Sequence, residues 1–394
     1  MDRSSFHIKP QIQSYAAEMQ RWRRHLHQYP ELDMACHETA AFVAEHLRAF
    51  GVDEVHEGIA ESGVVGVIYG QQGGDNGGPI TGLRADMDAL PIHEATGAAW
   101  QSTRPGRMHA CGHDGHTTML LGAARYLAET RQFSGKVVLL FQPGEEGTGG
   151  GRIMVEEGVL DRFGVEEVYA IHNSPTTPLG QFNTCIGPYS SSFDDFEIII
   201  TGRGGHASMP ADTIDPIAAA FAIGQAIYSI SARNIPSFKE AVISLTMMHA
   251  GDATNVIPDQ ATLAGTIRCL HPELRDLICG RVRDIVKAQE LAFGVTVEFR
   301  HTAGYSLMVN HAEQTHLGAQ AAAHRGAGEG QYRGKPGLGS EDFAYMLEAR
   351  PGSYFFVGQG VGPGLHNPSY DFNDALSPIG ASYLSQLIEE RHQL

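Results

Sequence analysis

Residues Lys136–Gly147 read Lys-Val-Val-Leu-Leu-Phe-Gln-Pro-Gly-Glu-Glu-Gly, and they indicate the class of fold. The apolar, β-branched run Lys136–Phe141 is typical of a strand that is buried in a parallel sheet. The end of this strand delivers a Pro-Gly pair and then two adjacent carboxylates, Glu145 and Glu146. Because α/β folds tend to place functional groups at the ends of their strands, we expect a site here.

Other short apolar runs predict further strands of the same domain. These are Val64–Tyr69, Ile80–Arg84, Val168–Ile171 and Tyr354–Val357, with a glycine-rich turn at Gly73–Pro79. The second run leads to Asp88, and the third ends in His172. Taken alone, His172 is equally well explained as a core histidine. The Glu145–Glu146 pair, taken alone, is better explained as two solvated acidic residues. Their common placement at strand ends is what favours a functional site.

Helical patterns alternate with these strands. Two lie between Ile12 and Phe50 and are broken at Tyr29–Pro30, and others span Thr117–Glu129, Gly151–Glu157, His311–His324 and Ala375–Arg391. Ser340-Glu341-Asp342 is predicted to open a short helix by a capping signal. The pattern predicts an α/β catalytic domain whose sheet is mixed, mostly parallel and flanked by helices.

The order of elements changes between residues 191 and 302. Strands at Phe193–Ile200, Ala241–His249, Ala261–Cys269 and Val295–Arg300 are combined with helices at Asp212–Ser231 and His271–Phe293. This β-α-β-β-α-β order is that of a split, ferredoxin-like unit. We therefore expect a discontinuous catalytic domain of residues 1–190 and 303–394, with an inserted α+β domain of residues 191–302.

The segment Met108–His116 holds one cysteine, three histidines and one aspartate around two glycines, a density that suggests metal binding. Cys111 and His113 alternate across a glycine, so both side chains can project the same way from an extended or looped backbone. A thiolate beside a neutral imidazole suits zinc or another late divalent metal. Two ligands are too few for a metal site, so other segments must supply the rest.

Further ligand candidates are Glu146, His172 and His366, which lie in loops at or near strand ends. One carboxylate of the Glu145–Glu146 pair can bind metal while the other takes a proton from metal-bound water, and spacing does not assign these two roles. Asp88 is predicted to orient a ligand imidazole, as metal-binding histidines commonly require.

The inserted domain carries two polar loops. His206 lies in a glycine-rich loop at a strand end, where it is a candidate donor for an oxyanion, from its own subunit or from a partner's. Arg268 follows the loop Asn255–Pro258 and can bind a substrate carboxylate by donating two parallel hydrogen bonds to it. Without other information, Arg268 is more often a surface arginine.

Composition limits the classes of function. The chain has 394 residues, 42% of them hydrophobic and 19% charged, as in globular proteins of two domains. Its formal net charge of −17 argues against nucleic acid and anionic membrane surfaces as partners. We expect a cytoplasmic protein, because the first residues lack the apolar core of a signal peptide and no apolar run is long enough to span a bilayer. Five scattered cysteines do not resemble a disulfide framework, which leaves Cys111 free to act as a thiolate.

Taken together, these motifs resemble the dinuclear-metal aminoacylase and carboxypeptidase family, in its branch of hippurate hydrolases and auxin-amino-acid amidohydrolases. The matching segments, in order, are Arg24–His27, Pro30–Leu32, Ala85–Pro91, His109–Asp114, Pro143–Gly147, Gly204–Ser208, Asn255–Pro258, Ser340–Phe343 and His366–Asn367. The resemblance spans nearly the whole chain. It implies that the inserted domain is a lid and dimerisation domain.

The resemblance also implies roles for individual residues. The positions that match the metal ligands are Cys111, His113, Glu146, His172 and His366, and Glu145 matches the general acid/base. In related members, the histidine that matches His206 completes the site across a dimer interface. The residues that match Asn255 and Arg268 hold the substrate's carboxylate.

The implied reaction is hydrolysis of an N-acyl amino acid, hippurate-like or N-acetylated, to a carboxylic acid and a free amino acid. Its cofactor would be two divalent metal ions per subunit, with zinc expected first and manganese, cobalt or nickel as alternatives. The expected partners are this small-molecule substrate and further copies of the chain, in a homodimer or higher homo-oligomer. Two other functions remain open, namely a dipeptidase or aminopeptidase of the same family and a metal-binding interaction module without catalysis.

Overall fold

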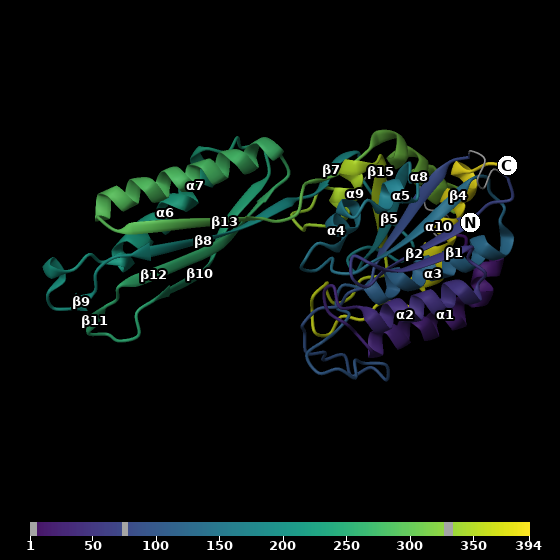
Figure 1. Cartoon of the computed structure of the whole chain (residues 1–394), viewed down its shortest axis with the longest axis horizontal. Coiled ribbons are helices and arrows are strands. Elements are labelled where there is room, and N and C mark those ends of the chain that lie inside the picture. The colour runs from purple at the N-terminus through teal and green to yellow at the C-terminus, as the bar shows by residue number, and fades with distance from the viewer. Residues whose placement is uncertain (1–5, 73–77, 327–333) are drawn as a thin grey trace. The chain divides into compact units, whose positions relative to one another are not determined.

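The computed structural model describes residues 6–72, 78–326 and 334–394, and the chain divides into two compact units (Figure 1). Unit 1 comprises Met1–Gly187, Val309–Lys335 and Asp342–Leu394, and unit 2 comprises Pro188–Met308 and Pro336–Glu341. The second piece of unit 2 falls inside the range that we expected to belong wholly to the catalytic domain. The predicted turn at Gly73–Pro79 lies largely on residues 73–77, outside the described ranges.

Unit 1 is built on a seven-stranded sheet in the order β1-β2-β4-β3-β5-β15-β6. The strands are β1 (Glu54–Ile59), β2 (Gly63–Tyr69), β3 (Ile80–Asp86), β4 (Lys136–Gln142), β5 (Glu167–Ser174), β6 (Phe182–Asn183) and β15 (Gly352–Gly358). The four strands β4, β3, β5 and β15 run parallel, whereas β1, β2 and β6 pair antiparallel with their neighbours. The predicted class, an α/β fold with a mixed sheet flanked by helices, is confirmed.

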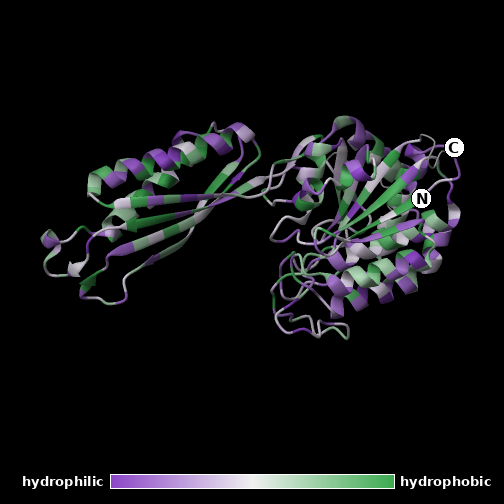
Figure 2. Cartoon of the chain, viewed as in Figure 1, coloured by the Kyte–Doolittle hydropathy of each residue, from purple (hydrophilic) through white to green (hydrophobic). Residues whose placement is uncertain are grey.

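Helices cover both faces of this sheet. They are α1 (Pro10–Gln28), α2 (His37–Ala49), α3 (His113–Thr130), α4 (Gly150–Glu156), α5 (Val159–Arg162), α8 (Ala312–His324), α9 (Phe343–Ala349) and α10 (Leu376–Arg391). Helix α3 packs on the central strands and contacts α1 and α10, while α4 and α9 pack together near β4 and β5. Apolar side chains of α3 belong to one core with Val137, Leu139 and Phe141 of β4, and Figure 2 shows hydrophobic residues concentrated along these central strands.

The carboxyl ends of three parallel strands, β3, β4 and β5, carry polar residues and lie next to one another. Asp86 at the end of β3 lies opposite Gln142 at the end of β4, and Arg84 of β3 lies opposite Ala170 of β5. The carboxyl ends of β3, β4 and β5 therefore meet side by side, as expected for parallel neighbours. His172 lies inside β5 and not after it, because β5 continues to Ser174.

Unit 2 is a four-stranded antiparallel sheet in the order β10-β12-β8-β13. Its elements are β8 (Ser192–Thr201), α6 (Pro216–Arg233), β10 (Ala241–Ala250), β12 (Gln260–Cys269), α7 (Pro272–Phe293) and β13 (Thr296–Ala303), with the short pair β9 (Gly205–His206) and β11 (Val256–Ile257). This is the predicted β-α-β-β-α-β order. Residues of α6 and α7 form one apolar core with the sheet, and hydrophilic and hydrophobic residues alternate along α7 (Figure 2).

Helix α6 begins four residues later than predicted, because the Asp215 side chain caps it. The Asp215 carboxylate accepts a hydrogen bond from Ile217 N, and Pro216 occupies the first helical position, where its missing N–H is not needed. None of the helices in the described ranges combines the length and the apolar character that crossing a bilayer requires.

Candidate metal centre

The Cys-Gly-His segment turns sharply at Gly112 and enters helix α3. Gly112 has φ +95°, and a Cβ atom there would lie 2.3 Å from Asn173 Oδ1 and 2.7 Å from Tyr370 Oη, so only glycine fits. The helix begins at His113, four residues before the predicted start at Thr117. The predicted loop therefore ends at Gly112, and His113 is held on the rigid first turn of a helix.

The predicted ligand side chains lie together at the strand ends of unit 1. Cys111 Sγ lies 3.4 Å from His172 Nε2. Glu146 Oε1 lies 3.1 Å from His366 Nε2 and 3.9 Å from His113 Nε2. The donor atoms of Cys111, His113 and His172 are all within 4.8 Å of one another, and so are those of Cys111, Glu146 and His366. These two groups share Cys111.

The hydrogen bonding of these side chains fits a bound metal. Both ring nitrogens of His113 and Glu146 Oε1 are buried. In the described part of the chain none of them makes a hydrogen bond of good geometry, although Glu146 Oε1 lies 3.1 Å from His366 Nε2 and His113 Nδ1 lies 3.4 Å from Asp88. Buried polar atoms without partners are rare and costly unless an ion or water satisfies them. His172 Nδ1 donates to Asn173 O at 2.7 Å, which leaves Nε2 facing Cys111 with its lone pair. A set of one thiolate, three imidazoles and one carboxylate is typical of zinc and other late divalent metals.

Local charge also favours a cation. Burial alone lowers the pKa of His113, but the carboxylates of Asp86, Asp88 and Glu146 outweigh it and raise the pKa to about 10. The same carboxylates attract a metal cation, which would displace the second proton of this imidazole on binding. Burial holds the pKa of His172 well below its ordinary value, so this imidazole is neutral, as a ligand must be.

Asp88 holds the acidic loop against this cluster. Its carboxylate accepts hydrogen bonds from Glu145 N and from Glu146 N, both at 3.0 Å. The same carboxylate lies 3.4 Å from His113 Nδ1. The Asp88 carboxylate therefore lies beside the imidazole of His113, and it also holds the backbone of the two glutamates, which the sequence did not indicate.

Asp86 and His116 form a second buried pair beside the cluster. Asp86 Oδ1 lies 2.6 Å from His116 Nδ1, and Asp86 Oδ2 lies 3.8 Å from His113 Nε2. His116 Nε2 lies 2.7 Å from Asn173 Oδ1, so both of its ring nitrogens are engaged. Sequence reasoning assigned no role to Asp86, although it precedes Asp88 by two residues at the same strand end.

His366 reaches the cluster from a strained loop. Its φ is +62°, in the left-handed region that is uncommon for residues other than glycine. A backbone hydrogen bond from His366 N to Ala110 O, of 2.8 Å, ties this loop to the segment that carries Cys111. Strain of this kind is concentrated at functional sites.

A comparison with known protein families identifies the chain. The profile of Peptidase family M20/M25/M40 matches residues 82–390, which include all five candidate ligands and Glu145. The chain belongs to this family. The resemblance inferred from the sequence motifs is thereby confirmed.

Individual M20 relatives are similar over most of their length. The hippurate hydrolase of Campylobacter jejuni is 38% identical over 381 residues, which cover 96% of this chain and 97% of the relative. Thermostable carboxypeptidase 1 of Saccharolobus solfataricus is 41% identical over 340 residues, or 85% and 84% of the two chains. The crystal structure of Bacillus subtilis YXEP protein, described as a dinuclear metal binding peptidase, matches with a TM-score of 0.81 and 32% identity over 95% of this chain and 98% of that one.

The remaining predicted site residues of this M20 chain lie in unit 2. His206 of β9 pairs with Val256 of β11, so it lies beside Asn255 in the loops beyond one end of the sheet (Figure 1). Arg268 lies near the opposite end of β12, and its Nη1 donates to Leu338 O at 3.3 Å and to Ser340 Oγ at 3.0 Å. Arg268 is eight residue steps along β12 from Gln260, which corresponds to about 26 Å. Within one copy, unit 2 thus keeps Arg268 apart from Asn255 and His206.

Proposed function

We propose that this M20 protein is a metal-dependent amidohydrolase that cleaves N-acyl amino acids to a carboxylic acid and a free amino acid. The observation that carries the proposal is the convergence of Cys111, His113, Glu146, His172 and His366 beside Glu145. Similarity to a hippurate hydrolase over nearly the whole chain supports an aromatic or short acyl group on an amino acid as substrate.

The cofactor of this reaction is proposed to be two divalent metal ions held by these five side chains. The two donor groups that share Cys111 support a pair of ions, and so does the similarity to a dinuclear metal binding peptidase. Thiolate ligation favours zinc, with manganese, cobalt and nickel as alternatives. When bound, such ions polarise the amide carbonyl and lower the pKa of bound water toward about 7.

Glu145 is proposed to be the general base and acid. Its carboxylate oxygen lies within 4.8 Å of the donor atoms of His113 and Glu146, and its backbone is anchored by Asp88. Glu145 is buried, so it works in a site that excludes most water. In this role Glu145 takes a proton from the attacking water and passes it to the leaving nitrogen.

His206 is proposed to donate a hydrogen bond to the developing oxyanion. Ser208 N–H donates to His206 Nδ1 at 3.2 Å, so Nδ1 is an acceptor and Nε2 carries the proton. His206 is exposed at the tip of unit 2, where it can meet a substrate. Asn255 and Arg268 lie at opposite ends of the sheet of unit 2. They can therefore hold the same substrate carboxylate only if they come from different copies of the chain.

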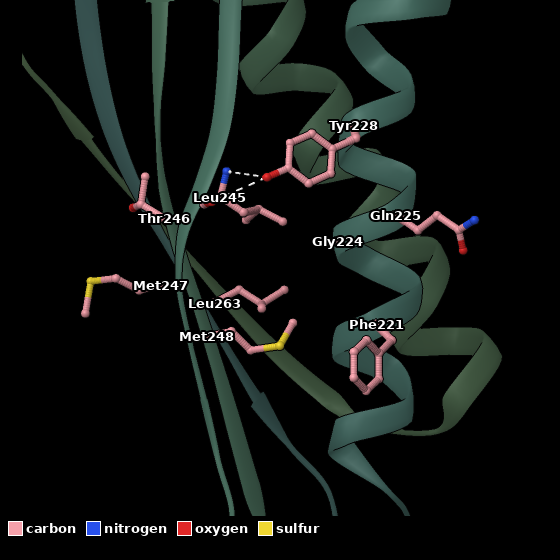
Figure 3. Close-up of a pocket in the computed structure, with 9 residues that line it drawn as sticks. All are labelled: Phe221, Gly224, Gln225, Tyr228, Leu245, Thr246, Met247, Met248 and Leu263. Atoms are coloured by element: carbon pink, nitrogen blue, oxygen red, sulfur yellow. Dashed lines mark hydrogen bonds between the residues drawn. The ribbon is translucent and has the colours of Figure 1, made fainter.

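We further propose that the chain forms a homodimer through unit 2. Strand β10 is at the edge of its sheet, and a groove of about 470 Å³ lies between β10 and α6 (Figure 3). Phe221, Met247 and Tyr228 line this groove with 63%, 53% and 52% of their surface exposed. Exposed aromatic and methionine side chains next to an unpaired strand edge are typical of protein interfaces.

Phe221→Asp tests the dimer. Sedimentation is expected to give a dimer mass for the wild-type protein and a monomer mass for this variant. Leu291→Asp, on α7, is the matched control, since Leu291 is 87% exposed outside the groove. A monomeric wild-type protein contradicts the proposal.

Activity on a panel of N-acyl amino acids tests the function. We expect hydrolysis of benzoyl-glycine or an N-acetyl amino acid, loss of activity after chelation, and recovery when one of the four metals is added back. A higher rate on glycyl-glycine than on benzoyl-glycine favours a peptidase, an alternative that similarity to a carboxypeptidase keeps open. No hydrolysis of any substrate by metal-loaded protein favours a non-catalytic module.

A cytoplasmic location stays a prediction, supported by five cysteines that are all free thiols.

A further inference from the structure

A buried polar cluster lies directly behind the metal centre and is not used by the proposed mechanism. Its core is Arg84 of β3, whose side chain is almost completely buried. The guanidinium donates from Nη1 to Asp86 Oδ2 at 2.8 Å, from Nη2 to Asp342 Oδ1 at 2.9 Å and from Nε to Gln142 Oε1 at 2.9 Å. The three nitrogens of the planar guanidinium thus each bind a different residue, and the three residues come from different parts of the chain.

Asp342 completes this cluster from the far end of the chain. Besides Arg84, its carboxylate accepts hydrogen bonds from Gln142 Nε2 at 2.8 Å and from Gly151 N at 2.7 Å. Asp342 precedes helix α9, but its side chain makes no capping hydrogen bond to that helix. The predicted short helix does begin directly after Ser340-Glu341-Asp342, but the Asp342 carboxylate is directed at Arg84 and not at the helix N-terminus.

The geometry of the cluster connects it to the metal centre through Asp86. Asp86 contacts Arg84 with Oδ2 and His116 with Oδ1, and its Oδ2 lies 3.8 Å from His113 Nε2. Two carboxylates, Asp86 and Asp342, share one guanidinium, so the three side chains together carry a formal charge of −1, and the Asp86 carboxylate is the part that contacts His116 and lies near His113. Fixed negative charge at that point orients a ligand imidazole and favours a cation beside it.

We propose that Arg84 and Asp342 are positioning residues of the metal centre. Their buried ion pair holds the Asp86 carboxylate against His113 and His116, and so determines the direction in which the His113 imidazole points. This inference rests on the proposed function, because it assigns His113 to metal binding. A buried ion pair usually adds little stability compared with apolar residues, which agrees with a functional reason for this one.

Asp342→Asn tests the proposal, because it removes the charge and keeps the shape. The probe is Co²⁺, whose visible absorption bands depend on the geometry of its ligands and can be read without turnover. We expect the bands of the variant to shift and its Co²⁺ affinity to fall about 10- to 100-fold, with a similar fall in kcat and little change in KM.

Glu167→Gln is the matched control. Glu167 is also buried and accepts hydrogen bonds from Arg391 Nε at 2.7 Å and Nη2 at 2.9 Å, but it is the first residue of β5, near the opposite end of that strand from His172. The control is expected to lower the melting temperature and to leave the Co²⁺ spectrum and affinity unchanged. If Asp342→Asn also leaves both unchanged, the cluster is only structural and the proposal is overturned.

Arg84→Lys provides a second test if Asp342→Asn does not fold. Lysine keeps the charge but cannot bind three acceptors in one plane, so the same spectral shift and loss of affinity are expected. A wild-type spectrum for a folded Arg84→Lys protein overturns the proposal. If wild-type protein hydrolyses no N-acyl amino acid, the proposed function fails, and the Co²⁺ spectrum and affinity still decide whether Arg84 and Asp342 position the centre.

Discussion

Replacing Asp88 with alanine is expected to weaken metal binding and turnover together, because one carboxylate holds the ligand loop, the general base and a ligand imidazole. A hydrogen bond to a charged group contributes about 1.5–3 kcal/mol to stability, so the two backbone hydrogen bonds to Glu145 and Glu146 together contribute about 3–6 kcal/mol. The cost of burying the Asp88 carboxylate must be subtracted from this value. Burial raises the pKa of Asp88, which shows that burying this charge is costly, and alanine avoids that cost. We therefore expect a net loss of about 2–3 kcal/mol in the free energy of unfolding.

The effect on metal binding is larger than this loss of stability would produce. Without Asp88 the Glu145–Glu146 loop is unanchored, and we expect the metal affinity to fall about 10- to 100-fold. Competition with a chelator measures this affinity, urea unfolding measures stability, and hydrolysis of benzoyl-glycine measures kcat. Asp53→Ala is the control, because Asp53 also accepts a backbone hydrogen bond, from Tyr69 N at 2.8 Å, but is exposed. An Asp88→Ala protein with reduced stability and wild-type metal affinity would refute the reasoning.

Three other substitutions test single features. Glu145→Gln should lower kcat about 10²- to 10⁴-fold with unchanged metal content by elemental analysis, and near-normal turnover would exclude Glu145 as the base. Cys111→Ser should abolish the thiolate-to-cobalt absorption band of the Co²⁺-loaded protein, and a retained band would point to a different thiolate ligand. Burial alone lowers the pKa of His27, but hydrogen bonds to Asp114 and Glu94 raise it to about 9 from an ordinary value of 6.5. The stability that this shift contributes, at most about 3 kcal/mol, is complete below about pH 6.5 and is lost as pH rises through 9. His27→Gln should remove this loss in urea titrations, and an unchanged loss would show that another group causes it.

Much of the candidate site could be predicted from the sequence because its signals are local. The apolar run of β4 is buried along its whole length, and the turn that follows must leave the sheet with Glu145 and Glu146 attached. Cys111 and His113 are two residues apart, so any compact conformation keeps them close. Strand β1 was missed because its sequence, Glu-Val-His-Glu-Gly-Ile, lacks an apolar run, and β1 forms at the sheet edge through pairing with β2.

The α/β class, the β-α-β-β-α-β order and the choice of ligand candidates therefore follow from the order of residues alone, since periodicity and residue type act over a few neighbouring residues. Tertiary structure alone decided what lies next to what across long distances in the chain. In the tertiary structure β4 lies between β2 and β3, and Arg84 is hydrogen-bonded to Asp342, 258 residues away in the chain. Arg268 and Asn255 lie at opposite ends of one sheet. The physical reason is that strand order and buried ion pairs depend on the packing of the whole core, which no short stretch of sequence encodes.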